Sequence, residues 1–283
     1  MDDSTQQREM YVTANGLRLR VLEWGDPAAA TTSFCLHGTS MHAQGWRMLA
    51  QALVPGIRVL ALDQRAHGES DIAPLGQYGV MDYYGDLAQI LDALELGRFA
   101  LIGSSVGSQV ALAYAARHPD RVTHLILSDV SFECPMATIE GYIHRHRTRP
   151  RVFETIEDAM AYSRQLEQRS RFTDAMHREV LDGDLRVRPD GRLEWRYALE
   201  PIVETLLKVP CDQWQDVANC RVPTLALRGD DSNVLLPATA ERLERTFPNG
   251  KVVLIGDSGH MIWTDQPQRL ADLTRDFIAT GRA

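Results

Sequence analysis

A serine and a histidine far apart in the chain have the sequence surroundings of a nucleophile and its base. Ser105 lies in "GSSVGS", where Gly103 and Gly107 complete a G-x-S-x-G spacing between an apolar run and a segment of helical period. A sharp strand-to-helix turn needs small residues at both glycine positions and exposes the serine hydroxyl. His260 lies in "DSGHM", in a glycine-containing loop before the last helical segment. Together they predict attack of an activated serine on a carbonyl group.

A second loop is suited to stabilise the negative charge that such an attack creates. "FCLHGTS" follows an early apolar run and begins a loop at His37-Gly38. Backbone N–H groups that point at a developing oxyanion are the usual donors for this purpose. We expect the N–H groups of Thr39 and Val106 to form the oxyanion hole, and the His37 side chain to stabilise the turn.

The elements that must position these residues follow from alternating apolar patterns. Strands are predicted over residues 32–38, 57–63, 98–104, 123–129, 223–229 and 251–256, and helices over 81–97, 106–118, 238–247 and 267–279. Gly97 is expected to stop the first of these helices. Near the N-terminus, Asn15-Gly16 between two strand-like runs predicts a hairpin. The alternation is typical of an α/β fold with a mostly parallel central sheet flanked by helices.

One long segment breaks the alternation. From about Phe132 to about Asp216 the chain is rich in Arg, His and Glu and contains helical fragments. We interpret it as a mainly helical cap inserted between two strands of the core. The predicted domains are residues 1–131 and 217–283 for the core and 132–216 for the cap.

Four motifs in order and spacing, "LHGTS", "DQRAHGES", "GSSVGS" and "DSGHM", resemble the α/β-hydrolase superfamily over nearly the whole chain. The resemblance implies that Ser105 is the nucleophile and His260 the base. It also argues against relatives with an aspartate nucleophile. The second motif is similar to the family's D-x-R-G-H-G-x-S loop, with Ala66 in place of a glycine.

The resemblance leaves the triad acid open. In most of the superfamily the acid lies three residues after the glycine that ends the strand, which here is Ser232, or four residues before the next landmark proline, which is Asn233. Neither is a carboxylate, and only a carboxylate holds the imidazolium by charge. Some members carry the acid after the preceding strand, where this chain has Asp129. We therefore predict Asp129, with Asp231 and then Asp230 as alternatives.

The expected reaction is hydrolysis of a carboxylic ester of a small molecule, without a metal or organic cofactor. Hydrolysis of an amide of a small carboxylated molecule is an alternative, because a subgroup with the relocated acid resembles such hydrolases from vitamin breakdown. A third is carbon–carbon bond hydrolysis, although "GSSVGS" lacks the asparagine that those relatives usually have before the serine. A small-molecule receptor on the same fold is the non-enzymatic alternative.

Four arginines near the start of the cap bear on the substrate. Arg145, Arg147, Arg149 and Arg151 form either a solvated helix face or a site in which Arg145 binds a substrate carboxylate bidentately. Trp195, Met261 and Trp263 either line the pocket or belong to the core, and we favour the core.

Composition limits the partners. A formal net charge of −8 disfavours nucleic-acid binding. The polar N-terminus lacks a signal-peptide pattern, and no apolar run approaches the ~18 residues that span a bilayer, so we expect a cytoplasmic protein without a membrane partner. The four cysteines are far apart and predict neither disulfides nor a zinc site. The sequence does not indicate an oligomeric state.

Overall fold

The computed structural model describes residues 7–54, 56–130, 132–166, 169, 171–208 and 211–281. A central eight-stranded sheet has the order β1-β2-β4-β3-β5-β6-β10-β11. In that order the strands are β1 (Arg8–Ala14), β2 (Leu17–Trp24), β4 (Ile57–Leu62), β3 (Thr31–Leu36), β5 (Phe99–Ser104), β6 (Val122–Ser128), β10 (Thr224–Gly229) and β11 (Gly250–Ile255). From β4 to β11 neighbours pair in parallel, whereas β2 is antiparallel to β1 and β4. The six strands predicted from the apolar runs are confirmed.

The hairpin between β1 and β2 is also confirmed. Asn15 and Gly16 have φ values of 49° and 76°, the positive pair that a type I′ turn requires.

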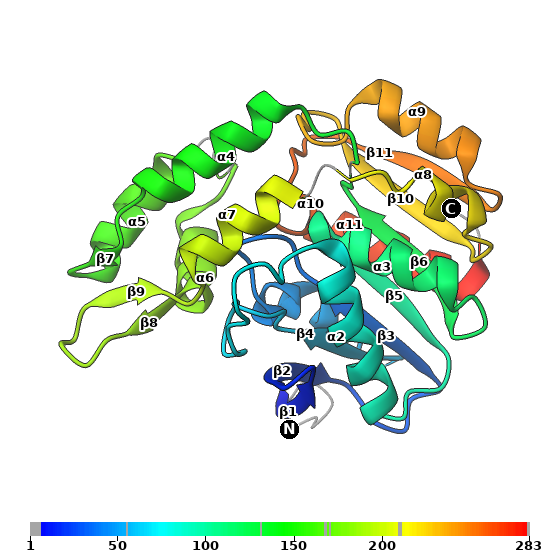
Figure 1. Cartoon of the computed structure of the whole chain (residues 1–283), viewed down its shortest axis with the longest axis horizontal. Helices are drawn as coiled ribbons and strands as arrows, with labels where there is room; N and C mark the ends of the chain where they lie inside the picture. Colours follow the sequence, from blue (N-terminus) through cyan, green and yellow to red (C-terminus); the bar gives the residue numbers. More distant parts are fainter. Residues whose placement is uncertain are drawn as a thin grey trace.

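Helices cover both faces of the sheet (Figure 1). Phe34 and Leu36 of β3 pack in the apolar cluster shared with α2 (Val80–Ala93), α3 (Val106–Arg117) and α9 (Pro237–Thr246), and Cys35 between them faces the cluster of α1 (Arg47–Leu53) and α11 (Pro267–Thr280). Successive side chains of a strand point to opposite faces, so a strand buried on both sides is apolar throughout. Two short helices, η2 (Ala43–Trp46) and α10 (Ile262–Asp265), precede α1 and α11. In the described ranges no helix is both long and apolar enough to cross a membrane.

The end of α2 differs from the expectation at Gly97. The helix ends at Ala93, and Glu95 rather than the glycine takes the left-handed conformation, with φ 50°. The N–H of Leu96 donates to the carbonyl of Leu91, at 3.2 Å, and the helix thus ends four residues before the glycine.

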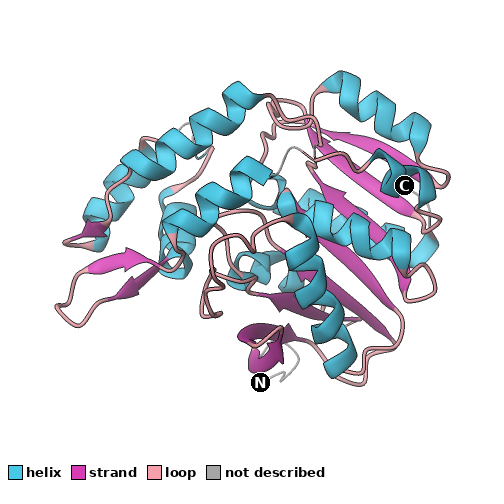
Figure 2. Cartoon of the chain, in the orientation of Figure 1, coloured by secondary structure: helices cyan, strands magenta, loops and turns pink. Residues whose placement is uncertain are grey.

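Between β6 and α8 (Trp214–Asn219) lie the elements that we call the inserted segment. They comprise α4 (Met136–Thr148), β7 (Val152–Phe153), α5 (Ile156–Arg164), α6 (Asp174–Asp184), β8 (Leu185–Val187), β9 (Leu193–Trp195) and α7 (Leu199–Lys208). Figure 2 shows these helices and their small sheet to one side of the large sheet. The strand order of the small sheet is β7-β9-β8, and the sequence reasoning did not predict it. In contrast, α8 packs against α3 and α9.

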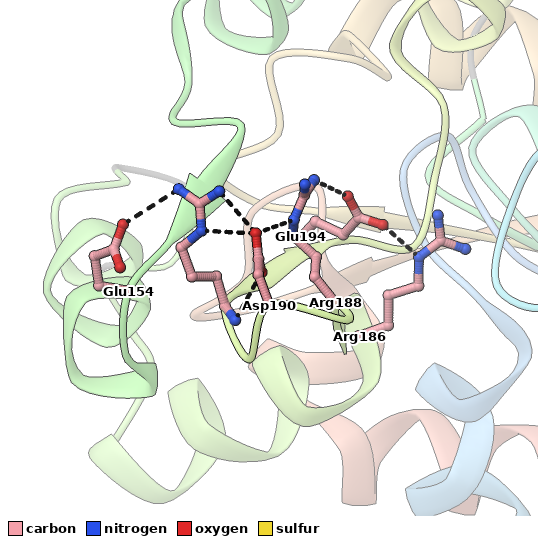
Figure 3. Close-up of polar contacts among 6 residues, drawn as sticks. Glu154, Arg186, Arg188, Asp190 and Glu194 are labelled. Carbon is pink, nitrogen blue, oxygen red and sulfur yellow. Dashed lines mark hydrogen bonds and ion pairs between the residues drawn. The ribbon is translucent and has the colours of Figure 1, made fainter.

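The hairpin β8–β9 carries a row of surface ion pairs (Figure 3). Glu194 accepts from Arg186 at 2.9 Å and from Arg188 at 2.8 Å, and Asp190 accepts from Arg192 at 2.8 Å. Exposed pairs of this kind contribute little to stability. These ion pairs thus form part of the solvent-exposed surface of the inserted segment.

Candidate active site

Ser105 occupies a strained turn between β5 and α3. Its φ of 51° and ψ of −121° lie outside the regions that non-glycine residues usually adopt, at a cost of about 1–3 kcal/mol. The turn needs both flanking glycines: an added Cβ would lie 2.5 Å from the Gly107 carbonyl oxygen at Gly103, and 2.3 Å from the Leu36 carbonyl oxygen at Gly107. The Ser105 N–H donates to the carbonyl of Ser128 at 3.0 Å, which ties the turn to the end of β6.

His260 forms a hydrogen bond with Asp129, which immediately follows β6. The distance from His260 Nδ1 to Asp129 Oδ2 is 2.7 Å, and the Asp129 side chain is fully buried while that of His260 is 17% exposed. Two further donors reach the carboxylate: Ser232 Oγ at 2.5 Å from Oδ2 and the Gly229 N–H at 3.3 Å from Oδ1. A carboxylate facing Nδ1 places the ring proton there and leaves a lone pair on Nε2.

The other two carboxylates proposed from the sequence have different partners. Asp231 is 73% exposed and pairs with Arg171 at 2.9 Å. Asp230 accepts from the N–H groups of Ser258 at 3.0 Å and Asp257 at 3.1 Å, and these backbone bonds lower the pKa of its carboxyl group. Asp230 therefore braces the loop that carries His260, without contacting the imidazole.

A third carboxylate, missed by the sequence reasoning, braces the same loop. Asp265 accepts from the Gly259 N–H at 2.8 Å, one residue before His260. Its side chain is 2% exposed, and burial raises its pKa. The histidine loop is thus held from two sides, by Asp230 and by Asp265.

The loop after β3 lies against Ser105 and is held by two buried histidines. An added Cβ at Gly38 would lie 3.0 Å from Ser105 Cβ. His37 Nε2 accepts from the N–H of Gln64 at 3.0 Å, and His67 Nε2 accepts from the N–H of Ser40 at 3.1 Å. Acceptance at Nε2 requires neutral rings, and burial lowers both pKa values, that of His67 to about 4.

These contacts locate the two predicted oxyanion donors. Thr39 lies between Gly38 and the tethered Ser40, beside the Ser105 turn. Val106 is the first residue of α3, so its N–H has no acceptor within the helix. His67 belongs to "DQRAHGES", and its role was missed by the sequence reasoning, although its place in that motif after a buried strand could have indicated it. Ala66, which precedes it, has a φ of 65°, in the region that glycine adopts without strain.

Ser105 and His260 line one cavity of about 590 Å³ between the sheet's loops and the inserted segment. Thr39 lines it from the loop after β3, and Met261 and Trp263 from the histidine loop. From α4 the lining residues are Tyr142, Arg145 and His146, and from α6 they include Met176. Met261 and Trp263, which we had interpreted as core residues, thus also border the cavity.

The four arginines of α4 and the following turn have different environments. The Arg145 guanidinium lies 4.7 Å from the centre of the Tyr142 ring and lines the cavity. Arg149 is buried over the rings of Tyr197, at 4.2 Å, and Trp195, at 4.8 Å. Arg147 and Arg151 are exposed. The solvated-face interpretation therefore fits only Arg147 and Arg151.

A buried charged cluster, which the sequence reasoning missed, borders the same cavity. His42 Nε2 lies 3.2 Å from Asp184 Oδ1, and Arg169 Nη2 donates to Asp184 Oδ2 at 2.8 Å. Burial alone would raise the pKa of Asp184, but the hydrogen bond from His42 and the charge of Arg169 hold it below its usual value. The cluster connects the loop after β3 to the inserted segment. Within the described part of the chain, no three His, Cys, Asp or Glu side chains gather as a metal site.

Comparisons with known proteins agree with this architecture. Residues 34–267 match the family model of the alpha/beta hydrolase fold. The sn-1-specific diacylglycerol lipase ABHD11 of Mus musculus is 30% identical over 251 residues, which cover 86% of this chain and 80% of that protein. The 2-hydroxy-6-oxo-2,4-heptadienoate hydrolase of Pseudomonas putida is 29% identical over 272 residues, 90% of this chain and 91% of that protein.

Among solved structures, E-2-(acetamidomethylene)succinate hydrolase superimposes with a TM-score of 0.88 over 97% of this chain and 100% of that chain. At 22% identity this likeness is one of fold. The match of the family model covers most of the chain, and the relatives named above are hydrolases. The chain therefore belongs to the α/β-hydrolase family of enzymes.

Proposed function

We propose that the protein is a serine hydrolase that cleaves a carboxylic ester, or a related acyl bond, of a small molecule. The observation that carries the proposal is the Asp129–His260 hydrogen bond, at 2.7 Å, beside a cavity that both His260 and the strained Ser105 line. A nucleophile, a base and a carboxylate that orients the base are the parts needed for acyl transfer.

The first half of the reaction forms an acyl-enzyme. Ser105 Oγ attacks the substrate carbonyl carbon while His260 Nε2 accepts the hydroxyl proton. Asp129 stabilises the imidazolium that results. The N–H groups of Thr39 and Val106 donate to the oxyanion. His260 then returns the proton to the leaving group as its bond to the acyl carbon breaks.

The second half uses water with the same groups. His260 removes a proton from a water molecule, which attacks the acyl carbon of the ester on Ser105. The tetrahedral intermediate collapses, Ser105 Oγ regains a proton from His260, and the carboxylic acid leaves.

We assign residues 132–216 to a cap that closes the site and selects the substrate. Support comes from the cavity, which α4 and α6 line opposite Ser105. Arg145 in this lining supports a second candidate, hydrolysis of an amide or ester whose substrate carries a carboxylate, because a guanidinium binds that group bidentately. The Pseudomonas putida relative supports carbon–carbon bond hydrolysis as a third.

Labelling with a fluorophosphonate probe, together with turnover of p-nitrophenyl esters, tests the serine mechanism. We expect Ser105 to be labelled and Ser105→Ala to abolish both labelling and turnover. Ser104→Ala is the matched control, because the neighbouring Ser104 hydroxyl is buried without a hydrogen-bond partner among the described residues. We expect Ser104→Ala to keep both labelling and turnover.

Absence of labelling and of turnover in the wild-type protein would reject the proposal. A small-molecule receptor on the same fold would then account better for the cavity. Turnover of a vinylogous diketone in preference to esters would instead support carbon–carbon hydrolysis.

A further inference from the structure

We propose that Ser232 is a positioning residue of the site: its hydroxyl donates to the carboxylate of Asp129 and sets both the orientation of that carboxylate and the charge it presents to His260. The inference rests on the proposed function for its catalytic consequences. Ser232 is the residue three positions after Gly229, where most of the superfamily has its acid. In this chain that position supports the acid instead of supplying it.

The direction of the hydrogen bond follows from the partners of Ser232 Oγ. The oxygen accepts from the N–H of Val234 at 3.1 Å and from that of Leu235 at 3.4 Å. A serine hydroxyl has two lone pairs and one proton. Both lone pairs are engaged by backbone donors, so the proton is left for Asp129 Oδ2 at 2.5 Å.

The hydrogen bond between Ser232 and Asp129 lies in buried surroundings. Asp129 is fully buried and Ser232 is 6% exposed, so bulk water does not compete with the hydroxyl for the carboxylate. Oδ2 accepts from both Ser232 and His260, and Oδ1 accepts from the Gly229 N–H, the one donor to it among the described residues. The serine therefore prevents the carboxylate from turning away from His260. It also draws part of the negative charge from the oxygen that faces the imidazole.

Two neighbouring strands of the sheet explain why Ser232 reaches Asp129. β6 and β10 are neighbours in the sheet, and Leu227 pairs with Ser128. Asp129 at the end of β6 and the loop after β10 thus begin side by side. Ser232 folds back across the end of β10, with its N–H donating to the Gly229 carbonyl at 3.1 Å.

Two titratable groups near the Asp129–His260 pair stay neutral in an activity assay around neutral pH. Burial raises the pKa of Cys134 to about 11 and that of Tyr142 to about 12, so both stay neutral. Asp265 and Arg171 flank the histidine loop on its other side, 4.0 Å apart. The acidic limb of the pH–rate profile is therefore read together with the NMR titration of the His260 ring, which follows that imidazole directly.

Ser232→Ala tests the inference, with Asn233→Ala as the matched control and Ser232→Thr as the conservative variant. Asn233 lies in the same loop, is exposed and is the other position at which an acid was expected. For Ser232→Ala we expect kcat/KM for p-nitrophenyl acetate to fall about 10- to 100-fold, as for loss of a hydrogen bond to a buried charge. The acidic limb should move to higher pH by about half to one unit, because the full charge of Asp129 then favours the imidazolium.

A merely structural serine would lower the amount of folded protein without moving the limb. An acidic limb that stays in place or moves to lower pH in Ser232→Ala overturns the inference, as does an equal shift in Asn233→Ala. Restoration by Ser232→Thr supports it. The NMR titration of the His260 ring in the wild type and in Ser232→Ala gives the same comparison without turnover. That titration separates failure of this inference from failure of the serine-hydrolase proposal, which the fluorophosphonate label reports.

Discussion

Replacing each candidate acid by asparagine is the most direct way to distinguish the triad acid from the other carboxylates. In Asp129→Asn the side chain keeps its shape but loses its charge, and its amide N–H₂ group competes with three donors for the same buried space. In Asp231→Asn the loss falls on a side chain that is 73% exposed and whose partner is Arg171. Both variants make the same chemical change, and they differ in whether the replaced carboxylate contacts His260.

The size of the effect follows from the geometry of the Asp129–His260 pair. At 2.7 Å and an effective dielectric constant near 20, a carboxylate attracts an imidazolium by about 6 kcal/mol. This attraction develops as His260 takes the proton of Ser105, so its loss raises the barrier. At about 1.4 kcal/mol for each factor of ten, Asp129→Asn should lower kcat by about four orders of magnitude. Asp231→Asn should change it by less than about two-fold.

The assay is kcat and KM for a p-nitrophenyl ester, with thermal unfolding of each variant to show that it folds. If Asp231→Asn lost as much activity as predicted for Asp129→Asn, the acid would lie in the loop after β10. If Asp129→Asn kept kcat within ten-fold of the wild type, the charge on Asp129 would be unimportant and the reasoning from distance and burial would be wrong.

Three further outcomes are expected. Ala66→Gly should raise the free energy of unfolding by about 1 kcal/mol, because Ala66 has a φ of 65°; a lower melting temperature would contradict this. Arg145→Ala should raise KM for a carboxylated ester about ten-fold and leave KM for a neutral ester unchanged, while the exposed Arg147 serves as control; equal effects on both esters would remove the carboxylate contact. The pKa of His67 falls from 6.5 to about 4 on folding, so its stabilising contribution is present above pH 6.5 and is lost as the pH falls toward 4. That loss is about 3 kcal/mol at most, and urea unfolding should show a shallower decline for His67→Gln.

The sequence by itself determined the helices and strands of the core and the strand-to-helix turn that carries Ser105. The inner strands of the sheet, such as β5 and β10, are buried on both faces, so each is a short apolar run, and the helices have periodic patterns of their own; both signals are local. The G-x-S-x-G spacing at Ser105 is local as well, because Gly103 and Gly107 are needed within the same turn. Where the local signal was ambiguous the prediction failed, as at Gly97, since a non-glycine residue, Glu95, closed α2.

The family resemblance favoured Asp129 but left Asp231 and Asp230 open, and only the tertiary structure shows which carboxylate contacts the histidine. Asp129 and His260 are 131 residues apart, and they meet because β6 and β10 are neighbours and the histidine loop folds over their ends. Asp230 and Asp231 are nearer to His260 in sequence, yet one braces backbone N–H groups and the other pairs with Arg171. The His42–Asp184 contact and the hydroxyl of Ser232 were beyond sequence patterns for the same reason. Each depends on where two distant segments meet, and a pattern along one segment carries no information about its partner.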